Sequence, residues 1–219
     1  MSDALFAQLV AATTGLLLLT AVLQVWRRSL HASIRLLAVQ GAALAGLVAT
    51  IGVADGELEV VAVSGLVLLI KAGALPWVLS RVARLTGATR EDSPRLNPTA
   101  GVLLAAVLTM IAYAVSQPVV AADLGPEARA VPVGLALVLL GFLVLLSRRS
   151  ALSQLIGFVV LDNGIATVAF LTAGGVPLVV ELGVSLDVLL VVLILRVLTS
   201  RMQVATGGTD LDDLRELRD

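Results

Sequence analysis

Residues 147–201 read SRRSALSQLIGFVVLDNGIATVAFLTAGGVPLVVELGVSLDVLLVVLILRVLTSR, and this stretch decides the fold. It predicts two apolar helices joined by a short GGVP turn, each long enough to cross a hydrocarbon core of about 30 Å. Asp162 and Asp187 lie near the centres of these two helices. Because a carboxylate at the bilayer centre costs about 2.5–3.5 kcal/mol on insertion scales, we expect both to face a protein interior or water rather than lipid.

The whole chain has the composition of a multi-pass membrane protein. Of its 219 residues, 58% are hydrophobic and 14% are charged, and the charges fall in short clusters between apolar runs. This composition excludes an ordinary soluble domain. The chain has no Cys and one His, which excludes Cys-ligated iron–sulfur clusters and argues against a multi-His metal or haem site. We therefore expect no cofactor in this chain.

The apolar runs predict an all-α bundle of seven transmembrane helices. Their ranges are about 4–25, 32–53, 58–82, 98–116, 131–147, 151–173 and 177–199. Arg27 and Arg28 follow the first run instead of preceding it, which indicates a retained helix rather than a cleaved signal peptide. Except for Arg129 and Lys71, the basic residues cluster after the first, third, fifth and seventh runs. The positive-inside rule then predicts the N-terminus outside and the C-terminus in the cytoplasm.

The third predicted helix contains Lys71, the only lysine in the chain. Lys71 lies about 12 residues from either end of the helix, or roughly 18 Å, which exceeds the reach of its four-carbon stem to either membrane surface. Pro76 follows five residues later and leaves the carbonyl of Ala72 without its usual helical partner. We therefore expect a locally broken helix beside a lysine that is either functional or structurally paired.

The order of the segments indicates a faint internal repeat. The predicted spans one to three and five to seven both turn at Arg-Arg-Ser, at residues 27–29 and 148–150, and Gln40 and Gly41 fall at nearly the same place as Asn163 and Gly164. We predict a first three-helix unit with a cytoplasmic connector over residues 1–97, a spacer helix with an external loop over 98–130, and a second three-helix unit with a cytoplasmic tail over 131–219. Such a parallel repeat would be related by an axis along the membrane normal.

The last two predicted helices carry most of the polar groups at membrane depth. We expect Asn163 to donate a hydrogen bond to a neighbouring carboxylate, and Gly164 to admit another backbone or a water. In the last helix, Glu181 and Asp187 are six residues apart, so they point about 240° away from each other and address different neighbours.

Two interpretations of these charged residues stay open. Lys71 poised against Asp162 or Asp187 could take up, pass on and release protons, because burial favours the neutral form of each group while the opposite charge nearby resists it. The alternative is an ion pair that only holds helices together. For Gln40, we expect an amide satisfied by a neighbouring helix.

Four segments resemble one known family. The segments LIKAGALPWVLSR around Lys71, LSRRSALSQLIGFVVLDNG around Asp162, VELGVSLDVLLVVLILRVL around Asp187 and the tail LDDLRELRD are similar to component E of hydrogenase-4 complexes. That family is related to formate hydrogenlyase and, over the last three spans, to the K subunit of respiratory complex I. The acid of the K-subunit motif falls near Val159, one turn before Asp162.

The resemblance implies a membrane-arm subunit of a group 4 [NiFe]-hydrogenase or formate hydrogenlyase in the inner membrane of a bacterial or archaeal cell. The implied partners are antiporter-like proton-channel subunits and a peripheral hydrogenase arm that holds the nickel–iron and iron–sulfur centres. The residues it implies for proton translocation are Lys71, Asp162, Asn163, Glu181 and Asp187. Two alternatives are a small subunit of a multisubunit cation/proton antiporter and a non-conducting scaffold.

Overall fold

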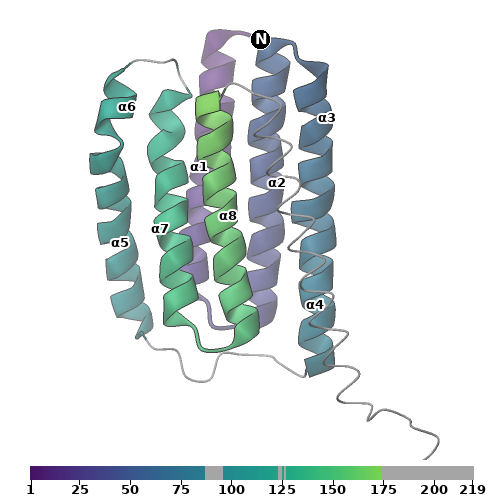
Figure 1. Cartoon of the computed structure of the whole chain (residues 1–219), viewed down its shortest axis with the longest axis vertical. Coiled ribbons are helices and arrows are strands. Elements are labelled where there is room, and N and C mark those ends of the chain that lie inside the picture. The colour runs from purple at the N-terminus through teal and green to yellow at the C-terminus, as the bar shows by residue number, and fades with distance from the viewer. Residues whose placement is uncertain (87–95, 123–124, 126, 174–219) are drawn as a thin grey trace, which may run out of the picture.

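The computed structural model describes residues 1–86, 96–122, 125 and 127–173, and all its regular elements there are helices. They are α1 (Asp3–Trp26), α2 (Leu30–Asp55), α3 (Leu58–Val67), the π-helix η1 (Leu68–Ala74), α4 (Leu75–Thr86), α5 (Pro98–Val115), α6 (Gln117–Ala121), the 3₁₀-helix η2 (Ala128–Ala130), α7 (Val131–Ser147) and α8 (Ala151–Ala173). Figure 1 shows the long helices standing side by side as one bundle.

Six helical segments in this part of the chain are long and apolar enough to cross a membrane. They match the first six predicted spans, because α3, η1 and α4 together form one continuous span, Leu58–Leu85. The protein is thus a multi-pass helical membrane protein. The predicted seventh span, 177–199, lies outside the described residues, as do Glu181, Asp187 and the tail.

Helix ends form where the sequence supplies capping groups. Ser2 accepts a hydrogen bond from the backbone N of Leu5, and Asn97 accepts one from Thr99 just before Pro98 opens α5. Gly56 ends α2 in the left-handed conformation, at φ 73°, which a residue without Cβ adopts at little cost. These groups satisfy backbone donors and acceptors that helix ends leave without partners.

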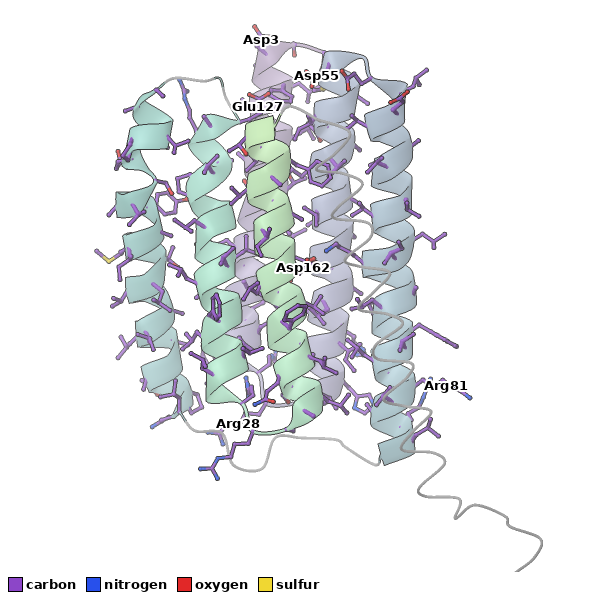
Figure 2. The ribbon with its side chains drawn as sticks, viewed as in Figure 1. Asp3, Arg28, Asp55, Arg81, Glu127 and Asp162 are labelled. Atoms are coloured by element: carbon purple, nitrogen blue, oxygen red, sulfur yellow. The ribbon has the colours of Figure 1, made fainter. Side chains whose placement is uncertain are left out.

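The two ends of the bundle differ in charge. Asp3, Asp55 and Glu127 lie at one end, called here the acidic end, while Arg28 and Arg81 lie at the other, called here the basic end (Figure 2). The helices between them are apolar. Acidic and basic side chains therefore sort to opposite sides of a layer that fits a membrane.

Helices α1, α2, α7 and α8 form the centre of the bundle. α1 packs against both α2 and α7, and α2 also packs against α8. The span from α3 to α4 flanks α2, while α5 flanks α7 and α1. Much of the α5 surface is exposed, as Leu103, Met110 and Val115 illustrate, and such side chains suit contact with lipid.

The contact between α7 and α8 is the most extensive in the described bundle. Each helix carries glycines seven residues apart, Gly134 and Gly141 in α7, Gly157 and Gly164 in α8. A Cβ at Gly157 would lie 2.5 Å from the backbone N of Leu145, and one at Gly164 would lie 2.5 Å from that of Val138. Only glycine allows backbones to approach this closely, so the glycines fix the register of α8.

Candidate functional site

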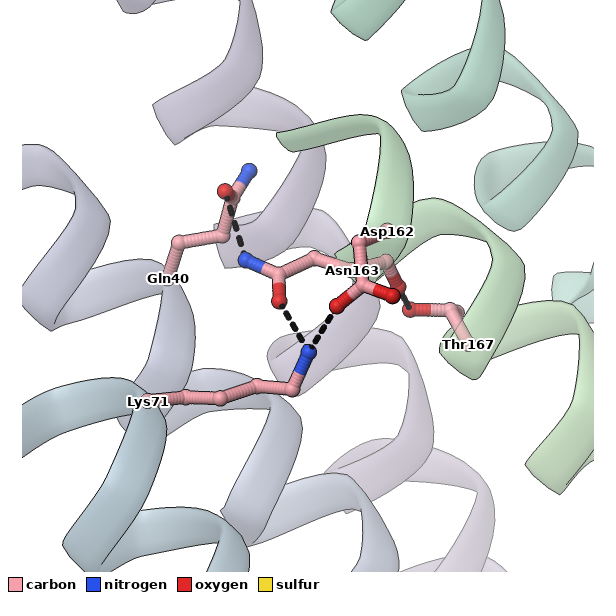
Figure 3. A network of polar contacts seen from close by, with 5 residues as sticks. All are labelled: Gln40, Lys71, Asp162, Asn163 and Thr167. Carbon is pink, nitrogen blue, oxygen red and sulfur yellow. Dashed lines mark hydrogen bonds and ion pairs between the residues drawn. The ribbon is translucent and has the colours of Figure 1, made fainter. Parts of the chain in front are cut away.

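The centre of the site is an ion pair between two spans. Lys71 Nζ contacts Asp162 Oδ2, and the two residues are 4% and 5% exposed, so the pair is sealed inside the bundle (Figure 3). Lys71 comes from the π-helical segment of the third span and Asp162 from the middle of α8. The structure therefore pairs Lys71 with Asp162, one of the two carboxylates that the sequence offered, 91 positions along the chain.

Asn163 extends the pair into a network. Lys71 Nζ donates to Asn163 Oδ1 at 2.9 Å, and Asn163 Nδ2 donates to Gln40 Oε1 at 3.0 Å. Gln40 Nε2 in turn points to the carbonyl of Leu17, 3.4 Å away. The expectation that Asn163 donates to a carboxylate was wrong, because the adjacent Asp162 is occupied by the lysine and the amide of Gln40 offers the acceptor (Figure 3).

Gln40 is satisfied by a neighbouring helix, as predicted, and it is also a member of the charged network. Its side chain is completely buried, and Asn163 is 1% exposed. Because each amide both donates and accepts, the two define a single orientation for the Asn163 side chain, with its oxygen toward the lysine. A buried polar network of this kind rigidifies its surroundings when every member is satisfied.

Two local features let the backbone of Lys71 approach the centre. A Cβ at Gly41 of α2 would lie 2.5 Å from the carbonyl carbon of Lys71, so glycine is needed for this contact. The π-helical turn in η1 has the backbone N–H of Leu75 bonded to the carbonyl of Ile70, five residues back. Pro76 cannot supply the usual helical donor at the next position, which accounts for the wider turn. The helix is therefore not broken here, contrary to the prediction from the sequence, but continues through a π-helical segment.

The backbone of α8 is held in place around the two polar residues. Thr167 Oγ donates to the carbonyl of Asn163 at 2.7 Å, and Gly164 admits the backbone of α7 beside it. The expectation that Gly164 allows a close backbone approach is confirmed. Val159, where the K-subunit motif would place its acid, is also buried on α8, at 2% exposure.

A second buried charge escaped the sequence analysis. Arg148, counted there as a loop residue, is 5% exposed and lies at the basic end between α7 and α8. Its guanidinium donates to the carbonyls of Gln24 at 3.0 Å and Arg27 at 2.6 Å, at the C-terminus of α1. These are carbonyls that a helix end leaves without partners, so Arg148 caps α1 from a distant part of the chain.

The described part of the site contains one ammonium group, one carboxylate and two amides, all buried. In the described ranges, no group of three or more His, Asp or Glu side chains is arranged to bind a metal ion. The chemistry that Lys71, Asp162, Asn163 and Gln40 can perform is rearrangement of hydrogen bonds and transfer of protons. Glu181 and Asp187, the other two predicted site residues, lie outside the described part of the chain.

Comparison with known proteins supplies the family. The chain is 48% identical to the uncharacterized protein Rv0085 of Mycobacterium tuberculosis over 220 aligned residues, which cover both chains completely. This chain belongs to the Rv0085 family. It is also 27% identical to hydrogenase-4 component E of Escherichia coli over 207 residues, covering 93% of this chain and 94% of that protein, and the Shigella flexneri component E matches equally.

The Rv0085 family member described here is thus a distant homologue of hydrogenase-4 component E along nearly its whole length. This supports the family resemblance drawn from the sequence. No family model matches the chain, and no solved structure matches it. The relation to the complex I K subunit stays a prediction.

Proposed function

We propose that this chain is a membrane subunit of a hydrogenase-type complex, and that its buried charged network takes part in redox-coupled proton translocation. The observation that carries the proposal is the Lys71–Asp162 ion pair at the centre of a membrane bundle. The homology to hydrogenase-4 component E supplies the kind of complex. In this proposal the nickel–iron and iron–sulfur centres belong to partner subunits in a peripheral arm.

The network offers a simple way to couple charge movement to structure. While Asp162 is ionised, it holds the ammonium group of Lys71 within a neutral pair. A proton arriving at Asp162 removes that attraction, so the ammonium group turns to another acceptor or passes its own proton on. Asn163 contacts the same ammonium group and also Gln40. A shift of the ammonium group would therefore alter hydrogen bonds in α2 as well as in α8.

The proposal extends to residues that only the sequence places in the site. Asp187 and Glu181 would supply further carboxylates at membrane depth, and antiporter-like channel subunits would continue the path laterally. The N-terminus and the acidic end would face outward and the basic end the cytoplasm, following the positive-inside rule, in the inner membrane of a bacterial or archaeal cell. The formate hydrogenlyase and complex I relationships belong to the same proposal.

Purification of the natively tagged protein from its own membranes tests the assignment to a complex. We expect co-purifying channel-like membrane subunits together with a peripheral arm that contains nickel and iron–sulfur centres. A set composed entirely of antiporter subunits without redox centres would contradict the hydrogenase assignment and favour the cation/proton antiporter.

Proton pumping by the complex in sealed vesicles tests whether this subunit takes part in proton translocation or is a non-conducting scaffold. Lys71→Met should lower proton uptake per hydrogen formed, since it removes the ammonium group from the network. The matched control is Thr50→Val, which removes a hydroxyl that bonds within its own helix, to the carbonyl of Gly46 at 2.7 Å. If the assembled Lys71→Met complex pumps protons as well as the control, the proton-translocation role is contradicted and the non-conducting scaffold is the remaining interpretation.

A further inference from the structure

A small polar cavity lies near the basic end of the bundle, where α1 and α2 meet the corner between α7 and α8. Its lining includes Gln24, Ser33, Arg148 and Ser153, together with Arg28, which Figure 2 shows at the basic end. The volume of the cavity is about 10 Å³. That is close to the least space that holds one water molecule, and it is too little for a phosphate or an organic ligand.

Gln24 brings a buried hydrogen-bond acceptor to this cavity. Its side chain is 1% exposed, and its Nε2 donates to the backbone carbonyl of Ser33 at 2.8 Å. That bond fixes the orientation of the amide, because the reversed amide would place two oxygens against each other. Oε1 is then left buried without a hydrogen-bond donor among the described residues. Buried polar oxygens are nearly always hydrogen-bonded, to protein or to water, so this oxygen calls for a donor.

Ser33 brings a hydroxyl group to the same cavity. It lies in the first turn of α2 and is 7% exposed. Its backbone N–H donates to the carbonyl of Ser29, and its own carbonyl accepts from Gln24. Its hydroxyl has no hydrogen-bond partner among the residues that the structure describes. The cavity therefore has two polar walls, one that only accepts and one that both donates and accepts.

The charges and dipoles around the cavity argue against an ion as its occupant. The guanidinium group of Arg148, a residue that is 5% exposed, lies in the lining and repels a metal cation. A small anion would meet the lone pairs of Gln24 Oε1, which need a donor rather than a second acceptor. A neutral molecule of this size that both donates and accepts is water.

We propose that this cavity binds one ordered water molecule, which donates a hydrogen bond to Gln24 Oε1 and bonds to the hydroxyl of Ser33. The water joins α1 to α2 at the basic end of the bundle. Gln24 is seven residues from Leu17 on α1, and Ser33 is seven residues from Gln40 on α2, roughly 10 Å along each helix, so the water lies outside the charged network. The inference depends only on the packing of these helices, and its test is independent of proton translocation.

Radiolytic footprinting tests the water directly. The full chain is reconstituted in lipid nanodiscs and given a short X-ray pulse, so that hydroxyl radicals formed from bound water oxidise the side chains beside it, and the oxidised positions are mapped by mass spectrometry. We expect Ile156, which lines the cavity and is 2% exposed, to be oxidised several-fold more than Ile51, a core residue that is 1% exposed. Ser33→Val, which puts methyl groups in place of the hydroxyl, should lower the oxidation of Ile156 to the level of Ile51. If Ser33→Val does not fold, Ser153→Leu fills the cavity from α8. Equal oxidation of the two isoleucines in the unaltered protein would overturn the site, and so would oxidation of Ile156 that the filling variant leaves unchanged.

A double-mutant cycle tests whether the water bridges the two side chains. Gln24→Met removes the acceptor and Ser33→Ala removes the hydroxyl, and the direct bond between these residues involves only the Ser33 backbone. We expect the melting temperature of the double variant to lie about 2–4 °C above the value obtained by adding the two single losses, because either variant alone already breaks the bridge. The matched control is Ser64→Ala, whose hydroxyl bonds to the carbonyl of Val61 in its own helix at 2.7 Å, and its loss should add to that of Gln24→Met. Additive losses for Gln24→Met and Ser33→Ala as well would overturn the bridge.

Discussion

Asn163 donates a hydrogen bond from Nδ2 to Oε1 of Gln40, 3.0 Å away and 123 residues earlier in the chain. This bond joins α8 to α2, and the carbonyl oxygen of the same amide accepts from Lys71. The two amides and the ion pair thus connect three membrane spans through one network. A change of charge at Asp162 therefore has a direct structural route to α2 and, through the Leu17 carbonyl, to α1.

Breaking the ion pair from one side should destabilise the protein more than removing both charges. We expect Asp162→Asn or Lys71→Met alone to cost on the order of 3–5 kcal/mol, because each leaves a buried group without its counterpart. The double variant should recover a substantial part of that loss. Thermal unfolding of the four proteins in detergent measures this as a double-mutant cycle. Additive losses would show that the two side chains do not interact.

Gln40→Leu should destabilise the bundle by about 1–3 kcal/mol, since it leaves the buried Nδ2 of Asn163 without an acceptor. The matched control is Gln117→Leu, whose exposed amide bonds only to the carbonyl of Tyr113, one turn earlier in the chain. Melting temperatures of the two variants make the comparison. Equal and small shifts would mean that the Gln40–Asn163 bond contributes nothing to stability.

Gly41→Ala should displace the backbone that carries Lys71. Its Cβ would lie 2.6 Å from the carbonyl oxygen of Lys71, and overpacking of this kind costs about 1–3 kcal/mol. Gly65→Ala is the control, because a Cβ at that position meets nothing within 4 Å. The readouts are melting temperature and proton pumping by the assembled complex. Gly65→Ala should leave both unchanged, and an equally harmless Gly41→Ala would contradict the close approach.

Arg148→Met should destabilise the basic end of the bundle by about 1.5–3 kcal/mol, because the last carbonyls of α1 lose a charged donor. Arg81→Gln, an exposed arginine at the same end, serves as the control. Hydrogen exchange of the amides near the ends of α1 and α7 measures the local effect. Faster exchange confined to the Arg148 variant is expected, and identical exchange in both variants would rule out a capping role.

The residue ranges of the membrane-spanning helices could be predicted from the sequence because they depend mainly on the length of each apolar run. The fifth and sixth predicted spans, 131–147 and 151–173, coincide with α7 and α8, and the first four agree within a few residues, while the seventh lies outside the described residues. Lys71 was recognisable as a candidate site residue because a lysine in the middle of an apolar span must find a polar partner. The short helices α6 and η2 were not predicted, because they lie between spans where hydropathy carries no signal.

The sequence could not predict which polar residues pair with one another inside the bundle, because this depends on how the helices pack. The sequence left Lys71 with two possible acids and gave Asn163 the wrong acceptor. The glycine contacts between α7 and α8 fix the position of Asp162 along the bundle axis. Gly41 determines how closely the backbone of Lys71 packs against α2. Arg148 was missed because a buried arginine and a loop arginine look the same in a basic cluster. The two-unit repeat stays a prediction.

The most direct test of the central claim is the number of protons moved per molecule of hydrogen formed by the intact complex in sealed vesicles, compared between the unaltered protein and Asp162→Asn. Asparagine has nearly the same shape as aspartate but holds no exchangeable carboxyl proton and no charge for Lys71. We predict a complex that assembles and still forms hydrogen but moves markedly fewer protons for each turnover. An assembled Asp162→Asn complex with an unchanged proton-to-hydrogen ratio would contradict the account.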